Sequence, residues 1–138
     1  MAIKHSEITS EIIRAFYQIY NEVGWGFIES VYSSVMASTL TSRGIPHERE
    51  KRLRVTHRGE CHGEFRADLV VAGVVLVEFK ACKQLVAAHE AQLLNYLRAS
   101  GLEVGLLLNF GPRPEMRRFV WSARQRMVAM DERESGDR

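Results

Sequence analysis

Glu78 and Lys80 stand two residues apart in an otherwise apolar segment that runs from Val74 to Cys82. Alternate residues of a β-strand point to the same face, so this carboxylate and this ammonium group would project together from a strand built for burial. Burying such charges costs several kcal/mol unless they are paired or bound to a metal ion. A simple ion pair, or a strand end that reaches solvent, would explain the motif without any chemistry.

Asp68 lies on the preceding predicted strand, across a turn at Ala72 and Gly73. With a two-residue hairpin loop Asp68 would face position 77, and with a three-residue loop it would face Glu78, so the two carboxylates are neighbours in both cases. Adjacent carboxylates repel each other unless a cation lies between them. Hard oxygen ligands favour Mg²⁺ or Mn²⁺ over zinc. The pair therefore predicts a divalent-metal site, beside which Lys80 would position or deprotonate an attacking water.

Two predicted helices carry further polar residues that could reach this site. His89, Gln92 and Tyr96 are three and four residues apart and share one helix face. If that helix packs over the face bearing the carboxylates, Gln92 could contact a metal-bound water or a phosphate, although His89 and Tyr96 could equally be ordinary boundary residues. Glu29 and Tyr32 also share a face, but a carboxylate in a first helical turn is favourable for the helix dipole alone.

The hydrophobic pattern indicates the elements that must position these residues. It predicts helices at 6–22, 27–43 and 84–100, with Ser6 capping the first and Gly24 ending it, and strands at 52–56, 63–71, 74–82, 104–110 and 115–123. The strands at 74–82 and 104–110 are apolar on both faces and should be central, and the helix between them indicates a parallel crossover. The expected fold class is α/β or α+β, with a mixed central β-sheet flanked by helices.

Length and composition limit the number of domains and the classes of function that the chain can have. With 138 residues, the chain suits a single domain, which we expect over residues 1–130, followed by a charged tail at 131–138. A net charge of +2 is too small to indicate nucleic-acid binding by itself. The two cysteines have no metal-type spacing, and no signal peptide or membrane-spanning run is seen. We therefore expect a cytoplasmic protein that does not bind membranes.

The motifs, taken in order, resemble those of the GxxExxY family, a branch of the PD-(D/E)XK nuclease superfamily. The matching segments are 26–32 (GFIESVY), 66–70 (RADLV), 77–80 (VEFK), 89–97 (HEAQLLNYL) and 105–111 (GLLLNFG). The resemblance spans about residues 5–120 and implies a restriction-endonuclease-like core. The E-x-K pair alone is a weak motif, whereas the full set, with its QxxxY element, is fairly specific.

The resemblance also implies roles for residues. It implies that Glu29, Asp68 and Glu78 form the acidic set and that the backbone carbonyl of Phe79 also binds the metal. It makes Lys80 the catalytic lysine and Gln92 a site residue, as in exonuclease-like relatives that carry QxxxY.

The predicted function is a nuclease that uses Mg²⁺ or Mn²⁺ to hydrolyse phosphodiester bonds, in DNA in preference to RNA. We expect nucleic-acid contacts from Tyr32, His89, Tyr96, Arg52, Arg54 and Arg66, and a homodimer would suit cleavage of two strands. Two alternatives stay open: a binding or regulatory module that keeps the nuclease fold without turnover, and a structural domain whose polar residues are ion pairs.

Overall fold

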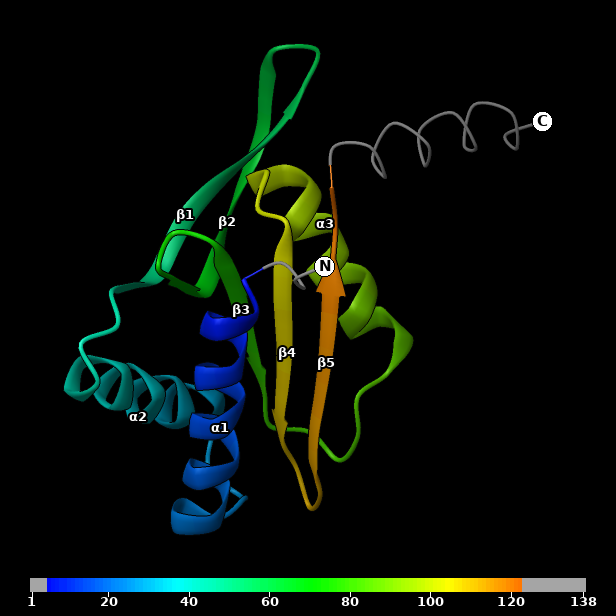
Figure 1. The fold of residues 1–138 in the computed structure, drawn as a ribbon. Helices are drawn as coiled ribbons and strands as arrows, with labels where there is room; N and C mark the ends of the chain where they lie inside the picture. The colour runs from blue at the N-terminus through cyan, green and yellow to red at the C-terminus, as the bar shows by residue number, and fades with distance from the viewer. Residues whose placement is uncertain (1–4, 123–138) are drawn as a thin grey trace.

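The structure, a computed structural model, describes residues 5–122. Its elements follow the predicted order of two helices, three strands, a helix and two strands. Figure 1 shows α1 (Ser6–Val23), α2 (Glu29–Ser42), β1 (His47–His57), β2 (Glu60–Val71), β3 (Val75–Lys80), α3 (Ala87–Ser100), β4 (Val104–Phe110) and β5 (Pro114–Val120). The charged tail predicted at residues 131–138 lies outside the described residues.

The five strands form one sheet in the order β1-β2-β3-β4-β5. Neighbouring strands are antiparallel except β3 and β4, which run parallel and are connected through α3. Every residue of β4 is buried, and β3 is buried as far as Phe79. The mixed sheet of an α+β fold, the central strands and the parallel crossover are therefore confirmed.

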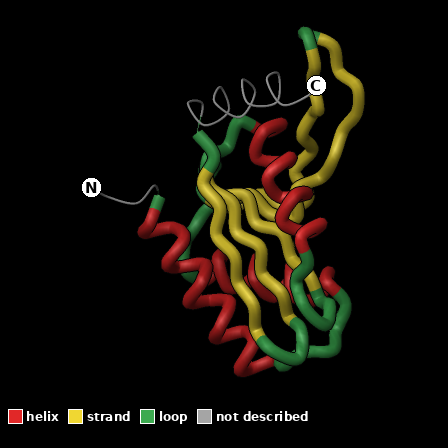
Figure 2. The backbone as a smooth tube through the Cα atoms, turned by 90° about the vertical axis from the view of Figure 1, so that its right-hand side faces the viewer, coloured by secondary structure: helices red, strands yellow, loops and turns green. Residues whose placement is uncertain are grey.

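Helices cover both faces of the sheet (Figure 2). On one face, Phe16 of α1 and Tyr32 of α2 belong to a buried cluster with Val77 and Phe79 of β3. On the opposite face, Leu93 of α3 belongs to a second buried cluster, which also contains residues of β2, β3 and β4. Burial at about 25 cal/mol per Å² of apolar surface makes these two clusters the main source of stability. β3 contributes to both clusters, so polar residues on it are held between two packed layers.

Several element boundaries differ from the predicted ones for identifiable reasons. β1 begins at His47 rather than at residue 52. The prediction missed its first residues because they are mostly charged and exposed and show no apolar alternation. β3 ends at Lys80 rather than at residue 82, since the Cys82 N–H donates to the Asn109 side chain at 3.0 Å. Ser6 is the first helical residue and not the cap of α1, whereas Gly24 ends that helix as predicted, with a φ of 78°.

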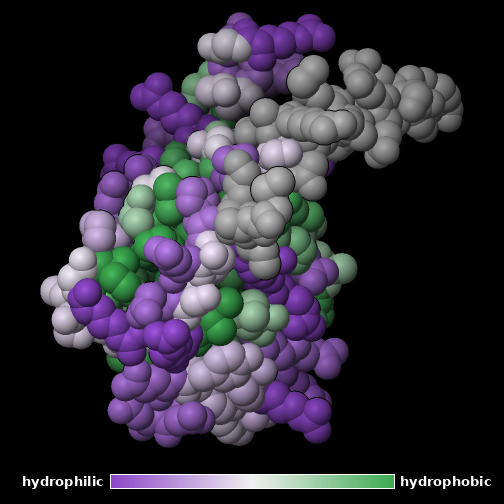
Figure 3. Space-filling model, viewed as in Figure 1, coloured by the Kyte–Doolittle hydropathy of each residue, from purple (hydrophilic) through white to green (hydrophobic). Residues whose placement is uncertain are grey.

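The hairpin of β1 and β2 rises well beyond the rest of the sheet (Figure 1, Figure 2). It is longer than the predicted strands because both strands continue to a turn at Arg58 and Gly59, where φ is 50° and 79°. In Figure 3 the protruding end is mainly hydrophilic. The hairpin is thus a polar arm whose base belongs to the core sheet.

In the described part of the chain, no helix combines the length and the apolar character needed to cross a bilayer. The homodimer and the cytoplasmic location stay predictions.

Candidate active site

The loop between β2 and β3 decides how Asp68 and Glu78 meet. The ladder pairs Leu69 with Val77 and Val71 with Val75, which leaves a three-residue loop at 72–74. Gly73 adopts a φ of 68° there, a conformation that favours glycine. Of the two registers that the sequence allowed, the three-residue loop is the one found, and its register places Asp68 opposite Glu78.

At this point the two carboxylates replace the regular strand pairing. The Asp68 N–H donates to Glu78 Oε2 at 2.8 Å, and the Phe79 N–H donates to Asp68 Oδ2 at 2.8 Å. Each carboxylate therefore satisfies a backbone donor of the opposite strand where a ladder carbonyl would otherwise serve. The side chains of Asp68 and Glu78 are thereby fixed between β2 and β3, close to each other.

The backbone of β2 is irregular at the same place. Ala67 packs in the cluster that contains α3 residues, whereas Leu69 packs in the cluster on the opposite face. Residues two apart in a regular strand share a face, so the alternation of β2 breaks at Asp68. In β1, Glu50 lies between the residues paired with Ala67 and Leu69, and it has a φ of 50°. Such a conformation is costly for a residue other than glycine, and strain of this kind clusters at functional sites.

Burial and mutual repulsion change the acidity of the pair. Burial, followed by the charge of Asp68, raises the pKa of Glu78 from 4.5 to about 8. Burial also raises the pKa of Asp68, against the lowering effect of the Phe79 N–H bond. Lys80 lowers both pKa values without cancelling the rise. Ionising both buried carboxylates beside a single cation is therefore unfavourable, and a divalent ion bound between them would relieve that cost.

Lys80 and Gln92 meet across the space between β3 and α3. The Lys80 ammonium donates to Gln92 Oε1 at 3.0 Å, so α3 holds the lysine beside the carboxylates. One turn further along α3, the Tyr96 ring stacks on Phe65 of the hairpin, with 3.9 Å between the ring centroids. Burial and the charges of Glu78 and Asp68 raise the pKa of Tyr96, which places its hydroxyl near them.

Glu29 approaches from the opposite side of the sheet. It is exposed in the first turn of α2 and lines a hollow of about 220 Å³ together with Glu50 and Asp68. Glu29 contributes to the raised pKa values of both Asp68 and Glu78, and Glu50 contributes to that of Asp68. The structure thus brings the three predicted carboxylates into one region and adds Glu50, which the sequence analysis missed. Glu50 sits in a charged segment, HEREK, that gave no sign of a special backbone.

Two residues with predicted nucleic-acid contacts, Tyr32 and His89, have structural roles in the fold. Tyr32 is fully buried and stacks on Phe110, with 4.0 Å between the ring centroids, so its predicted contact with nucleic acid is wrong. Residues three apart share a helix face, but the packing of α2 turns Tyr32 into the core while Glu29 stays at the surface. His89 accepts the Val86 N–H through Nδ1 at 3.1 Å and so caps the start of α3. A nucleic-acid contact by His89 stays a prediction.

The three predicted arginines lie on the hairpin. Arg52 pairs in register with Arg66, and Arg54 follows Arg52 at the spacing that puts both on one face. Leu53 and Phe65 point to the other face. Leu53 packs against the buried cluster that contains Leu93, and Phe65 stacks on Tyr96. The arginines are exposed and share one face of the arm, where Glu64 pairs in register with Arg54.

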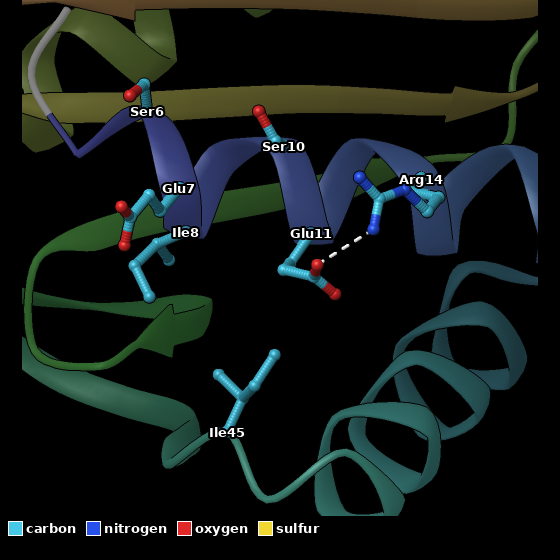
Figure 4. A pocket seen from close by; sticks show the side chains of 7 residues that line it. All are labelled: Ser6, Glu7, Ile8, Ser10, Glu11, Arg14 and Ile45. Carbon is cyan, nitrogen blue, oxygen red and sulfur yellow. Dashed lines mark hydrogen bonds and ion pairs between the residues drawn. The ribbon is translucent and has the colours of Figure 1, made fainter. Parts of the chain in front are cut away.

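A separate hollow lies beside the first turns of α1 (Figure 4). It measures about 510 Å³ and is closed on one side by Ile45. Its cation, Arg14, is engaged by Glu11 at 2.9 Å. Because neither Asp68 nor Glu78 lines it, this hollow is not part of the candidate active site.

Comparison with known proteins now decides the family. The model of the PD-(D/E)XK nuclease superfamily matches residues 6–119. The chain belongs to that superfamily. Among solved structures, the crystal structure of a protein called SSO0001 has a TM-score of 0.56 and 19% sequence identity, over 76% of this chain and 56% of that one. The chain thus spans little more than half of that protein, and the likeness shows the fold alone. A comparison with curated proteins finds no match.

PD-(D/E)XK nucleases typically use divalent metals, and the residues of this chain suit such an ion. Asp68 and Glu78 each use one oxygen for a backbone hydrogen bond. Their other oxygens, Oδ1 and Oε1, accept no hydrogen bond from residues 5–122 and are the hard donors that Mg²⁺ or Mn²⁺ prefers. Within the same residues, no three His, Cys, Asp or Glu side chains form a ready-made metal cluster. The fit therefore rests on two carboxylates, with the remaining positions left to other oxygens.

Proposed function

We propose that the protein is a divalent-metal-dependent nuclease that hydrolyses phosphodiester bonds, in DNA in preference to RNA, and that it belongs to the GxxExxY branch of its superfamily. The observation that carries this proposal is the pairing of Asp68 and Glu78 at a break in the strand ladder, with Lys80 held beside them by Gln92. An uncompensated carboxylate pair next to an anchored ammonium is costly to keep in a core and suits metal-assisted hydrolysis.

In this proposal Asp68, Glu78 and the Phe79 carbonyl would hold Mg²⁺ or Mn²⁺, with Glu29 assisting from α2. The ion would polarise the phosphate and lower the pKa of a bound water. Lys80 would orient the attacking water and stabilise negative charge as it develops on the phosphate. Gln92 fixes the position of Lys80, because a mobile ammonium would lose the geometry on which such stabilisation depends.

The exposed arginines of the hairpin suit phosphate contacts that position the substrate without reading its sequence. Binding through such contacts weakens steeply as salt rises. A matched test is Arg54→Ala, which removes one exposed cation from the arm and should reduce the salt dependence of binding without abolishing cleavage at low salt.

The proposal is tested by a cleavage assay on linear, circular and single-stranded DNA and on RNA, with Mg²⁺, Mn²⁺ or EDTA. We expect metal-dependent cleavage that is lost in Lys80→Ala and Glu78→Ala and kept in Lys51→Ala, which changes a half-buried lysine of β1 that pairs with Glu48. Cleavage that survives both site variants would contradict the proposal.

A second candidate is a binding or regulatory module that keeps the fold without turnover. It is favoured by the hydrogen bonds that already satisfy part of both carboxylates, and by the lack of a third clustered ligand within residues 5–122. A folded protein that binds nucleic acid but cleaves none of the substrates with either metal would select this function.

A further inference from the structure

Exposed apolar side chains gather in the connection between α1 and α2. Trp25 is 59% exposed, Phe27 53% and Ile28 71%, and all three lie within four consecutive residues. Single exposed apolar residues are common, but a cluster of large ones marks a binding surface. This cluster ends directly at Glu29, the acidic residue that borders the candidate active site.

The connection that carries these side chains is held in place. Tyr32 donates its hydroxyl to the Gly24 carbonyl at 2.7 Å and accepts the Phe27 N–H at 3.2 Å. The Phe27 ring also meets the Tyr32 ring edge to face, with 6.3 Å between centroids. Because Tyr32 is itself fully buried, Trp25 and Phe27 are presented from a fixed backbone. Rigid presentation of aromatic rings lowers the entropy lost on binding.

Trp25 and Phe27 form one wall of a groove of about 430 Å³. The facing wall includes Cys82 and Lys83, in the segment that directly follows Lys80. Both walls therefore adjoin residues of the candidate active site along the chain, because Phe27 lies two residues before Glu29 and Cys82 lies two residues after Lys80. The volume lies in the range of about 300–1,000 Å³ that is typical of ligand sites.

Two cationic side chains, Lys83 and Arg113, line a second hollow beside the groove. A neighbouring hollow of about 580 Å³ shares Lys83 with the first and is also lined by Tyr17 and Arg113. Lys83 and Arg113 make no ion pair with any residue of 5–122, whereas Arg117, on the same hollow, lies 3.7 Å from both Glu90 and Glu115. Figure 1 shows the end of α1, the chain after β3 and the turn between β4 and β5 at the same lower end of the molecule.

We propose that this groove binds an unpaired nucleotide of the substrate, whose base stacks on Trp25 and Phe27 while adjacent phosphates lie along Lys83 and Arg113. The inference rests on the proposed nuclease function and narrows its substrate to single strands, or to duplexes with an unpaired end. A single strand has exposed base faces, and one negatively charged phosphate joins each nucleotide to the next. The groove offers exposed aromatic rings for the bases, followed by two cations, without ion pairs within residues 5–122, for the phosphates. A closed duplex does not fit, since its base faces are covered by their neighbours.

The test measures binding of fluorescein-labelled oligonucleotides by anisotropy, in the Lys80→Ala background with Mg²⁺. The ligands are single-stranded DNA, single-stranded RNA, a blunt duplex, and a single strand with abasic sites. Loss of one stacking ring weakens binding by about 5- to 150-fold. We expect that loss for Trp25→Ala on the intact single strand, little loss for Trp25→Phe, and little for either on the abasic strand or the duplex.

The matched control is Val55→Ala, which removes an exposed apolar side chain from the distant hairpin and should change no affinity. Equal losses on intact and abasic strands, or no loss with Trp25→Ala and Phe27→Ala combined, would overturn the inference. A wild-type dimer that this double variant converts to a monomer in sedimentation would also overturn it, because the surface would then serve a second copy of the chain. Comparing single-stranded DNA with RNA shows which sugar the groove accepts.

The same variants separate this inference from the nuclease proposal. Metal-dependent cleavage that is lost in Lys80→Ala, but keeps its ratio of single-strand to duplex cleavage in the Trp25 and Phe27 variants, would refute the groove and leave the nuclease standing. Stacking-dependent binding without any cleavage would support the groove and refute the nuclease.

Discussion

The raised pKa of Glu78 makes stability depend on pH in a direction opposite to that of most paired carboxylates. In the metal-free protein burial and Asp68 raise this pKa from 4.5 to about 8, so the folded state holds the proton more tightly than the unfolded state. A raised carboxylate pKa contributes stability that is fully present below about pH 4.5 and is lost as pH rises through about 8. The metal-free protein should therefore lose stability across that window.

The size of the loss follows from the same pKa values. At about 1.4 kcal/mol for each pH unit between the two pKa values, the change amounts to up to about 5 kcal/mol. Glu78 is only 5% exposed, so solvent screens little of it. A loss of that size is a large fraction of the about 5–15 kcal/mol that stabilises a typical domain.

The assay is urea unfolding in EDTA, followed by circular dichroism at several values between about pH 5 and about pH 9, for the wild type and Glu78→Gln. Glutamine keeps an oxygen for the Asp68 N–H but cannot ionise, so this variant should lack most of the fall. Glu22→Gln, on exposed α1 surface, controls for the loss of one carboxylate and should follow the wild type. Parallel profiles for the wild type and Glu78→Gln would refute the argument that the two carboxylates repel each other in a buried site.

A bound metal ion should reverse the loss of stability at high pH. An ion held by Asp68 and Glu78 binds the folded state only, and at a concentration of about 100 times its Kd it adds about 2.7 kcal/mol. We expect Mn²⁺ to restore stability to the wild type near the upper end of the pH range and to have little effect on Glu78→Gln. Equal stabilisation of both proteins would place the metal elsewhere.

Three further predictions concern neighbouring parts of the site. Gln92→Ala removes the 3.0 Å contact with Lys80 and should lower the cleavage rate by about 10- to 100-fold with little change in the urea midpoint. Gly111→Ala would drive a methyl group into a backbone carbonyl and should destabilise by several kcal/mol (roughly 3). At Gly105 the methyl group would meet the side chains of Leu93 and Leu97 at 3.1 to 3.2 Å, with no backbone atom among its three nearest neighbours, and should cost less, as urea titrations can compare. Glu50→Gly should raise the stability of the metal-free protein by about 1 kcal/mol by relieving its φ of 50°, yet weaken Mn²⁺ binding measured by calorimetry.

The sequence predicted the fold well where burial was complete. β3 and β4 are apolar on both faces because both are covered, and this pattern was enough to predict the parallel crossover. β1 was predicted too short because most of its residues are exposed and so show no apolar alternation. The same burial explains why Glu78 stood out from the sequence, since a carboxylate contrasts with apolar neighbours only in a buried strand.

The geometry of the site was harder to predict from the sequence than the residues that form it. The register of Asp68 against Glu78 depended on a loop in which Ala72, with a φ of 52°, extends the turn by one residue, a conformation that alanine rarely adopts. Tyr32 was misplaced because a shared helix face spans both surface and core. Glu50 was missed because backbone strain leaves no trace in residue types.

The break in the strand ladder links these observations. Two N–H groups, of Asp68 and Phe79, would lose their partners where the alternation of β2 fails, and buried donors without partners are costly. The carboxylates of Asp68 and Glu78 satisfy them with one oxygen each, which fixes both side chains while leaving the second oxygens for a cation. An ion could therefore bind without breaking either hydrogen bond, because the irregular strand orients both carboxylates. The strain at Glu50 and the repulsion at Glu78 are then two parts of one arrangement, whose cost the bound ion would offset.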